Sequence, residues 1–230
     1  MAPDTPSADG DGTGDDGDRG TGTTATVLLT RHGETPWNAA RRIQGWAPVG
    51  LNDRGRDQAR TAAGRIDGAY DVDRVVASDL TRTRETTRIL RSALGLPHDA
   101  VTFERGWRER DFGVYQGLGY DEVYEGRPEF AVGETGVASF RATPEGGEST
   151  LAARERVMDA WERLLEGLDP GETVLVVTHG GPIHVVLADV AGHDLVTELD
   201  EHSNDNCAVS EIRVVDGDPT LVRRNETGGR

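Results

Sequence analysis

Short apolar blocks alternate with longer amphipathic stretches along most of the chain. Four of these blocks have the length and composition of buried strands. They cover residues 25–30, 74–77, 101–104 and 173–177. Four amphipathic stretches predict helices, at 53–66, 79–93, 149–168 and 182–190. Strands that alternate with helices predict an α/β protein, here a three-layer α/β/α sandwich with a mainly parallel sheet.

Local signals support these boundaries. Asn52, Ser78 and Ser149 stand directly before predicted helices and are expected to cap them. Pro182 suits the first turn of the last predicted helix. Near the end of the chain, 208–215 and 220–223 flank an Asp-Gly-Asp turn and predict a closing hairpin.

Two segments lack the periodic pattern. Residues 1–24 have almost no apolar side chains and carry six Asp and one Arg, so a disordered acidic tail is expected. Residues 106–147 are rich in Gly, Pro and acidic residues, with short helical pieces such as 121–124, and predict a lid over the site. The rest, residues 25–230, is expected to be a single domain.

Charge limits the partners. The net charge is −16, and all 25 basic residues are Arg. Such a protein repels phosphate backbones and anionic lipid, so neither nucleic acid nor a membrane is expected as a partner. The acidity, with 35% hydrophobic residues, favours the salt-rich cytoplasm of a halophile. Compositional bias of the genome is the alternative.

The single cysteine, Cys207, excludes an internal disulfide and fits a reducing compartment. The first residues lack the apolar core of a secretory signal, and no run approaches the ~18 apolar residues of a membrane span. A cytoplasmic protein is therefore expected. The sequence leaves the oligomeric state open, with a homodimer as one alternative.

The most informative residues follow the first predicted strand. Arg31, His32 and Gly33 stand at its carboxyl end, where open α/β sheets bind their ligands. Arg offers a planar fork of donors to phosphate oxygens, and His can attack phosphorus. This pattern predicts a phosphoryl-binding site.

The stretch resembles the histidine phosphatase superfamily, also called phosphoglycerate mutase-like, whose hallmark is Arg-His-Gly after the first strand. Six further segments resemble that family and occur in its order. They are NAARRIQGW (38–46), GLNDRGRDQA (50–59), SDLTRTRETT (78–87), RERDFGVYQG (108–117), PEGGES (144–149) and VLVVTHGGPI (174–183). The resemblance covers most of 25–215 and implies phosphoryl transfer through a phosphohistidine, as in the broad-specificity phosphatase branch.

The resemblance also implies roles for individual residues. His32 would be the nucleophile, and Arg31 and Arg82 the phosphate clamp. His179 matches the second histidine, which binds the transferring phosphoryl group and orients the nucleophile. Asn38 matches an Asn that contacts phosphate.

Glu109, in RERDFG, matches the glutamate that donates a proton to the leaving group. Asp111, two residues further on, is the runner-up. The Gly180 amide, near a predicted helix start, adds a further phosphate donor. Three consecutive residues are expected, by resemblance, to shape specificity: Gln44, Gly45 and Trp46.

No metal or other cofactor is expected. His179 and His184 are five residues apart across a Gly-Gly-Pro turn, and the sequence has no HExxH motif and no cysteine pair. A P-loop is absent because the chain has no Lys.

Hydrolysis of a small phosphorylated metabolite is the favoured function. The alternative is a 2,3-bisphosphoglycerate-dependent phosphoglycerate mutase, which shares every catalytic residue. Mutases of the family carry basic residues in the lid, whereas 113–150 holds only Arg127 and Arg141 among more numerous acidic residues. A phospho-ligand-binding module without catalysis is a third hypothesis, disfavoured because all expected catalytic residues are present.

Overall fold

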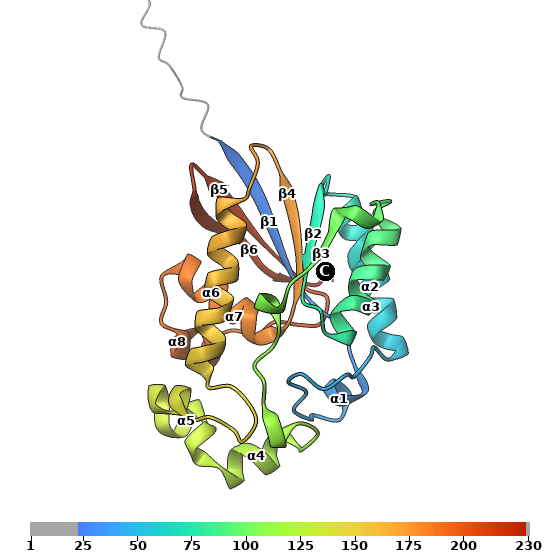
Figure 1. The fold of residues 1–230 in the computed structure, drawn as a ribbon. Helices are drawn as coiled ribbons and strands as arrows, with labels where there is room; N and C mark the ends of the chain where they lie inside the picture. Colours follow the sequence, from blue (N-terminus) through green and yellow to red (C-terminus); the bar gives the residue numbers. More distant parts are fainter. Residues whose placement is uncertain (1–22, 229–230) are drawn as a thin grey trace, which may run out of the picture.

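A single mixed sheet of six strands forms the centre of the computed structural model, which describes residues 23–228 (Figure 1). The strands run in the order β3-β2-β4-β1-β5-β6. They are β1 (Thr24–Arg31), β2 (Arg74–Ala77), β3 (Val101–Phe103), β4 (Thr173–Thr178), β5 (Val209–Val215) and β6 (Asp218–Glu226). The first four in this order pair in parallel, and β5 and β6 extend the sheet as an antiparallel hairpin.

Helices lie on both faces of this sheet and at its lower end (Figure 1). They are α1 (Pro36–Ala39), α2 (Asp53–Asp67), α3 (Thr81–Ala93), α4 (Tyr120–Gly126), α5 (Val132–Thr135), α6 (Thr150–Glu166), α7 (Gly180–Ala191) and α8 (Leu195–Glu201). α2 and α3 share one hydrophobic cluster with the sheet, and α6 and α7 share the other. The predicted α/β sandwich is therefore confirmed.

The central strands are buried on both faces, which explains their continuous apolar sequences. In β1, Val27 and Leu29 pack into the cluster with α6 and α7, whereas Leu28 packs into the cluster with α2 and α3. In β4, Val176 and Val177 alternate in the same way. This alternation fixes which residues reach each helix layer, because a slip of one residue would exchange the two faces.

The structure corrects several predicted boundaries. Ser78 does not cap α3, which begins at Thr81 after Leu80 and has no side-chain cap. α7 begins at Gly180, two residues before Pro182. The seven-residue α8 has too few turns to show a period in the sequence and was not predicted. The predicted tail, 1–24, lies outside the described residues except for Thr23, whose N–H donates to Asp216, and Thr24, which begins β1.

The loop after β1 packs directly on the first turn of α2, and two glycines make this approach possible. A Cβ on Gly33 would overlap the backbone oxygen of Gly55, and a Cβ on Gly55 would overlap that of Glu34. Gly33, which the sequence associates with the phosphate site, is thus required by packing against α2. The contact holds the residue beside His32 in place.

Gly55→Ala is expected to destabilise the protein by about 1–3 kcal/mol, because neither backbone can move away from the added methyl group. Gly64→Ala is the matched control in the same helix, since a Cβ there meets nothing within 4 Å. It is expected to stabilise by about 0.4–1 kcal/mol through the unfolded state. Urea unfolding of both variants measures the difference; equal effects would contradict the packing argument.

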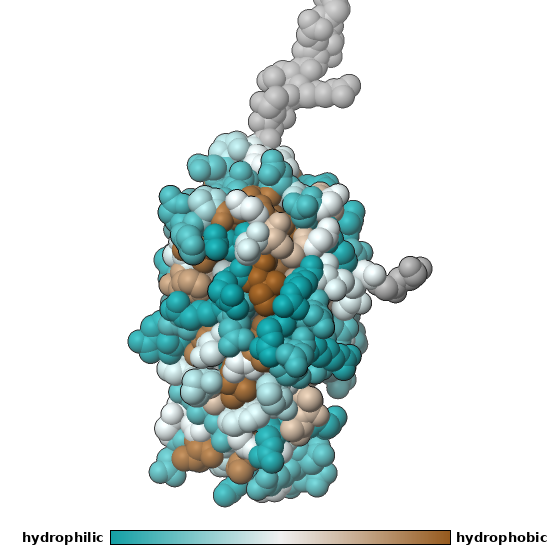
Figure 2. Space-filling model, turned by 90° about the vertical axis from the view of Figure 1, so that its right-hand side faces the viewer, coloured by the Kyte–Doolittle hydropathy of each residue, from teal (hydrophilic) through white to brown (hydrophobic). Residues whose placement is uncertain are grey.

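Hydrophilic residues dominate the face shown in Figure 2, with hydrophobic residues in small scattered patches. Among the described residues, no helix combines the length and apolar character needed to cross a bilayer.

Candidate active site

Three polar side chains follow three neighbouring parallel strands at their carboxyl ends. Ser78 follows β2, His179 follows β4, and His32 follows β1, in the order in which these strands lie in the sheet. All three residues are buried, with at most 2% of their surface exposed. The strand ends therefore bring together residues that are far apart in the sequence, as expected for a ligand site in an α/β sheet.

Arg82, in the first turn of α3, joins the two histidines. Its Nε–H donates to both His32 Nε2 and His179 Nδ1, each at 3.2 Å. Its terminal nitrogens donate to the carbonyls of Gly45, at 2.8 Å, and Ala47, at 3.4 Å. Hydrogen bonds thus fix the guanidinium at Nε and at both terminal nitrogens, and only 1% of the residue is exposed to solvent.

These contacts determine where each imidazole carries its proton. Arginine can only donate, so His32 Nε2 and His179 Nδ1 must present lone pairs. His32 Nδ1–H then donates to the Gly33 carbonyl, at 2.8 Å, and His179 Nε2–H donates to Ser78 Oγ, also at 2.8 Å. The two histidines are held in opposite tautomers, and His32 presents a lone pair on Nε2.

Burial and the neighbouring positive charges of Arg82 and Arg31 hold the pKa of His32 well below its usual value. The pKa of His179 is lowered for the same reasons, with His32 as a further contributor. Burial lowers the pKa of Arg82 to about 10, which keeps it charged at neutral pH. The centre thus combines a cation with two neutral imidazoles, one of which is suited to nucleophilic attack.

These tautomers are directly measurable by nitrogen NMR of the imidazoles. We expect His32 as the Nδ1–H form and His179 as the Nε2–H form, both still neutral at pH 6. Because unfolded histidines bind protons near pH 6.5 and these folded ones do not, the pair makes stability fall as the pH drops below about 6.5. Protonation of either ring with a midpoint near 6.5 would contradict this prediction.

Arg31 is held beside this centre by the loop that precedes β5. Its Nη1 donates to the Asn204 carbonyl at 2.7 Å, while Asn206 Nδ2 donates to the His32 carbonyl at 2.7 Å. Arg31 Nε is buried and has no hydrogen-bond partner among the described residues. A buried donor of this kind is costly unless a ligand satisfies it, and an oxyanion would do so.

Glu109 reaches the same region from the lid. Its carboxylate accepts from the Arg110 amide at 2.9 Å and from the Gly181 amide, in the first turn of α7, at 3.3 Å. Asp111 instead accepts from the Gly113 amide at 2.9 Å and lines none of the cavities described below. The geometry therefore favours Glu109 over Asp111 as the acid.

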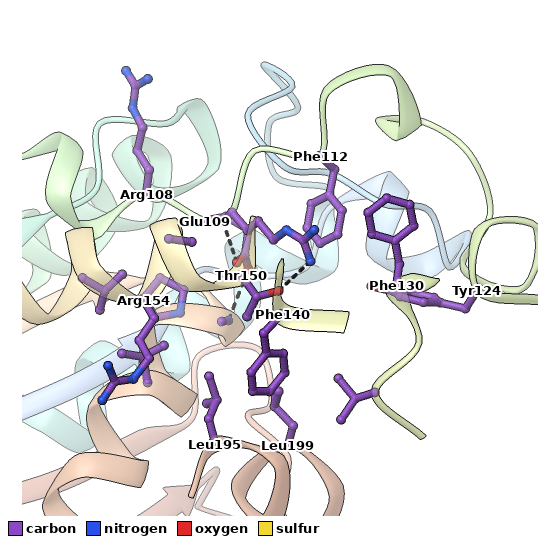
Figure 3. Close-up of a pocket in the computed structure, with 17 residues that line it drawn as sticks. Arg108, Glu109, Phe112, Tyr124, Phe130, Phe140, Thr150, Arg154, Leu195 and Leu199 are labelled. Carbon is purple, nitrogen blue, oxygen red and sulfur yellow. Dashed lines mark hydrogen bonds between the residues drawn. The ribbon is translucent and has the colours of Figure 1, made fainter. Parts of the chain in front are cut away.

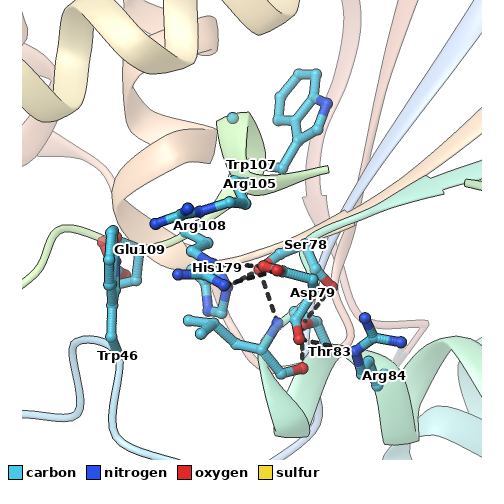
Figure 4. Close-up of polar contacts among 12 residues, drawn as sticks. Trp46, Ser78, Asp79, Thr83, Arg84, Arg105, Trp107, Arg108, Glu109 and His179 are labelled. Carbon is cyan, nitrogen blue, oxygen red and sulfur yellow. Dashed lines mark hydrogen bonds and ion pairs between the residues drawn. The ribbon is translucent and has the colours of Figure 1, made fainter. Parts of the chain in front are cut away.

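The backbone around Glu109 is fixed by two further side chains. Trp46 Nε1–H donates to the Glu109 carbonyl at 2.7 Å, and its ring lies under the Arg108 guanidinium, which pairs with Asp79 (Figure 4). Arg156, on α6, donates to the carbonyls of 105, 106, 108 and 109. Trp46 therefore supports the backbone of Glu109. The role of Arg156 was not predicted.

A hollow of about 470 Å³ opens above the centre. Most of the predicted residues line it: Arg31, His32, Gln44, Gly45, Arg82, Glu109 and Gly180. His179 lies below it, against Arg82. Asn38 lines a neighbouring hollow that also includes Arg31, and its Oδ1 accepts from the amide and hydroxyl of Thr35.

Other lining residues were not predicted. Tyr120 and Tyr124 come from α4, and His184, His202 and Asn204 come from α7 and the segment after α8. Two tyrosines spaced four residues apart in the segment predicted to be a lid were a sequence signal for residues that line the site. The polar run 202–206 was a second signal of this kind, because it stands just before a predicted strand.

Comparison with known proteins agrees with this geometry. The sequence model of the histidine phosphatase superfamily (branch 1) matches residues 27–227. Phosphoglycerate mutase-like protein 4 of Arabidopsis thaliana is 40% identical over 201 residues, which is 86% of this chain and 84% of that protein. The metal-independent phosphoserine phosphatase of the same plant is 36% identical over 160 residues, 70% of this chain and 66% of that protein.

A 2,3-bisphosphoglycerate-dependent phosphoglycerate mutase of Parvibaculum lavamentivorans is 31% identical over 207 residues, 88% of this chain and 92% of that protein. Among solved structures, Bacillus stearothermophilus YhfR superposes with a TM-score of 0.74 at 28% identity, covering 90% of this chain and 98% of that one. The chain belongs to the histidine phosphatase superfamily, whose members include phosphatases and phosphoglycerate mutases.

Proposed function

We propose that this protein hydrolyses small phosphomonoesters through a phosphohistidine on His32, without a metal ion. The proposal rests on one observation: a neutral His32, whose Nε2 bears a lone pair, lies beside two arginines. Arg82 supplies fixed positive charge, and Arg31 supplies an unsatisfied buried donor. Preorganised donors of this kind stabilise the charge that develops on the equatorial phosphoryl oxygens.

The reaction has two steps. In the first, the His32 Nε2 lone pair leaves its hydrogen bond with Arg82 Nε–H and forms a bond to phosphorus while the bond to the leaving oxygen breaks, and the Glu109 carboxyl group gives its proton to that oxygen. In the second, the Glu109 carboxylate takes a proton from water, whose oxygen attacks phosphorus as the phosphorus–nitrogen bond breaks. Inorganic phosphate leaves, and both side chains return to their starting states.

A second cavity, of about 330 Å³, adjoins the hollow on the side of Glu109. Aromatic and aliphatic side chains surround it, including Phe112, Phe130, Phe140 and Leu199 (Figure 3). Glu109 lines both cavities, so a leaving group that it protonates has apolar surface within reach. This supports a substrate whose leaving group has an apolar or aromatic part.

The same region argues against the mutase alternative. A mutase has to hold a second acidic group of its intermediate, which calls for uncommitted cations near the leaving group. Two cations flank Glu109: Arg108 pairs with Asp79, and each of the three side-chain nitrogens of Arg110 donates within the protein, to Glu148 O, Thr150 Oγ and Ala142 O. Arg127 and Arg141 are exposed and do not line the two cavities, and Arg154 lines the second cavity only from an exposed position on α6.

Phosphorus NMR in EDTA and molar KCl tests the proposal. One sample contains 3-phosphoglycerate with a trace of 2,3-bisphosphoglycerate, and parallel samples contain 1-naphthyl phosphate or glycerol 3-phosphate. We expect inorganic phosphate and no 2-phosphoglycerate, with 1-naphthyl phosphate hydrolysed at least about tenfold more efficiently than glycerol 3-phosphate, since apolar burial contributes about 25 cal/mol per Å². Formation of 2-phosphoglycerate with little free phosphate would replace this proposal with the mutase.

A further inference from the structure

Three side chains with metal-ligating atoms converge where α7 gives way to α8. His193 follows Gly192, whose left-handed backbone ends α7, Glu198 lies within α8, and His202 follows its last residue. One ligand atom from each lies within 4.8 Å of the others. Glu198 Oε2 is 3.9 Å from His193 Nδ1 and 4.0 Å from His202 Nε2. None of the three has a role in the proposed reaction.

The centre of this cluster is buried and incompletely satisfied. Glu198 has no exposed surface, and its Oε1 is held by Arg224 and lies 3.4 Å from His184 Nδ1. Its Oε2 is buried without a hydrogen-bond partner among the described residues, and the same is true of His202 Nε2. Buried polar atoms without partners are costly, and a cation bound by both would satisfy them.

The spacing fits a transition metal better than a set of ion pairs. At 3.9 and 4.0 Å the imidazoles are beyond hydrogen-bond distance of Oε2. Ligands of a tetrahedral zinc ion, at bond lengths of about 2.0–2.2 Å, lie about 3.4 Å apart. Side-chain rotation that shortens the two distances from Oε2 by about 0.5 Å, and brings the two imidazole nitrogens, now within 4.8 Å, to the same spacing, would give that geometry. Arg224 and His184 orient the carboxylate from outside, as outer partners of metal ligands do.

We propose that His193, Glu198 and His202 bind a divalent transition metal, with zinc as the best match, beside the hollow that His202 also lines. The two imidazoles and one carboxylate suit zinc and leave a fourth position for water. The His193 side chain is 40% exposed, which gives the ion a path from solvent. No step of hydrolysis passes through this ion.

The site would also fix the segment that completes the phosphate pocket. His202 begins the run to Asn206, and that run supplies the Asn204 carbonyl to Arg31 and the Asn206 amide to the His32 carbonyl. A bound ion would tie the first residue of this segment to α8. Its role is therefore structural, beyond the proposed catalytic function.

Zinc titration of the EDTA-treated full chain against a chromogenic chelator tests the site. We expect one Zn²⁺ per chain with a dissociation constant below about 1 μM. His193→Gln should weaken binding at least about tenfold, and His193→Cys, which keeps a zinc ligand, should largely restore it. His98→Gln, at an exposed histidine outside the cluster, is the matched control and should bind as the wild type does.

Hydrolysis in EDTA should be the same for His193→Gln and wild type, because His193 lines neither cavity. Equal rates would show that the variant is folded. They would also show that loss of zinc binding does not affect hydrolysis, so that the two proposals can fail independently. The proposal would be overturned by binding weaker than about 10 μM, or by tight binding that His193→Gln leaves unchanged. The visible spectrum of Co²⁺ provides a second measurement, since four-coordinate cobalt absorbs far more strongly than the hexaaqua ion.

Discussion

Replacing His32 with Ala is expected to lower turnover of phosphomonoesters at least about 10³-fold and to abolish the labelled phosphoenzyme. His32 lines the hollow, whereas the neighbouring His179 does not line it and has its Nε2 directed at Ser78, so His179 is not expected to take its place. Quenched-flow labelling, followed by acid and base treatment of the labelled protein, measures the phosphohistidine directly.

His32→Gln is a second variant for this experiment, since it retains most of the side-chain volume in a buried site. His98→Gln serves as the control at an exposed position. Turnover above about a tenth of the wild-type rate in both His32 variants would exclude His32 as the nucleophile. A normal rate with no labelled protein would exclude the phosphoenzyme.

Removal of the Arg82 side chain is expected to reduce kcat/KM by about 10²–10³-fold, equivalent to about 2.7–4 kcal/mol of transition-state stabilisation. This guanidinium supplies fixed charge beside Nε2 of His32, the proposed nucleophile, and also connects His32 to His179. Arg82→Lys should recover only part of the loss, because an ammonium group cannot reach the histidines and the Gly45 carbonyl in the same way.

The matched control is Arg88→Ala, an exposed arginine on the same helix. It removes an equal charge from α3 without altering the centre, so kcat/KM should stay within about twofold of wild type. Urea unfolding of both variants separates loss of catalysis from loss of folded protein. A folded Arg82→Ala variant with near-normal kcat/KM would remove Arg82 from the phosphate clamp.

Much of the fold follows from local patterns in the sequence. The central strands are apolar on both faces, and the long helices carry amphipathic faces and clear ends, so both were predicted within a few residues. His32 and His179 could be located because each directly follows a strong strand pattern and stands in a motif that resembles those of the histidine phosphatase superfamily. α8 was not predicted because a seven-residue helix shows no reliable hydrophobic period. Its N-cap, Asp194, looks like an ordinary surface residue in the sequence.

What could not be predicted depends on contacts between distant segments. Ser78 resembles a helix cap in the sequence, but its hydroxyl meets a histidine 101 residues away. Trp46 resembles a substrate contact, but it supports the Glu109 backbone. Arg156 is one of many arginines in the sequence, and only the folded lid shows its four carbonyl partners. Local patterns place strand ends, whereas tertiary packing decides which side chains meet there.

The position of β4 has a consequence for biosynthesis. This strand lies between β1 and β2, although about a hundred residues separate it from β2 in the chain. A nascent chain that ends before residue 173 would lack the strand that joins the two halves of the sheet, together with His179 and the loop that holds Arg31. Closure of such long loops and parallel pairing are slow steps. We therefore expect the catalytic centre to assemble only after most of the chain has left the ribosome, late in folding.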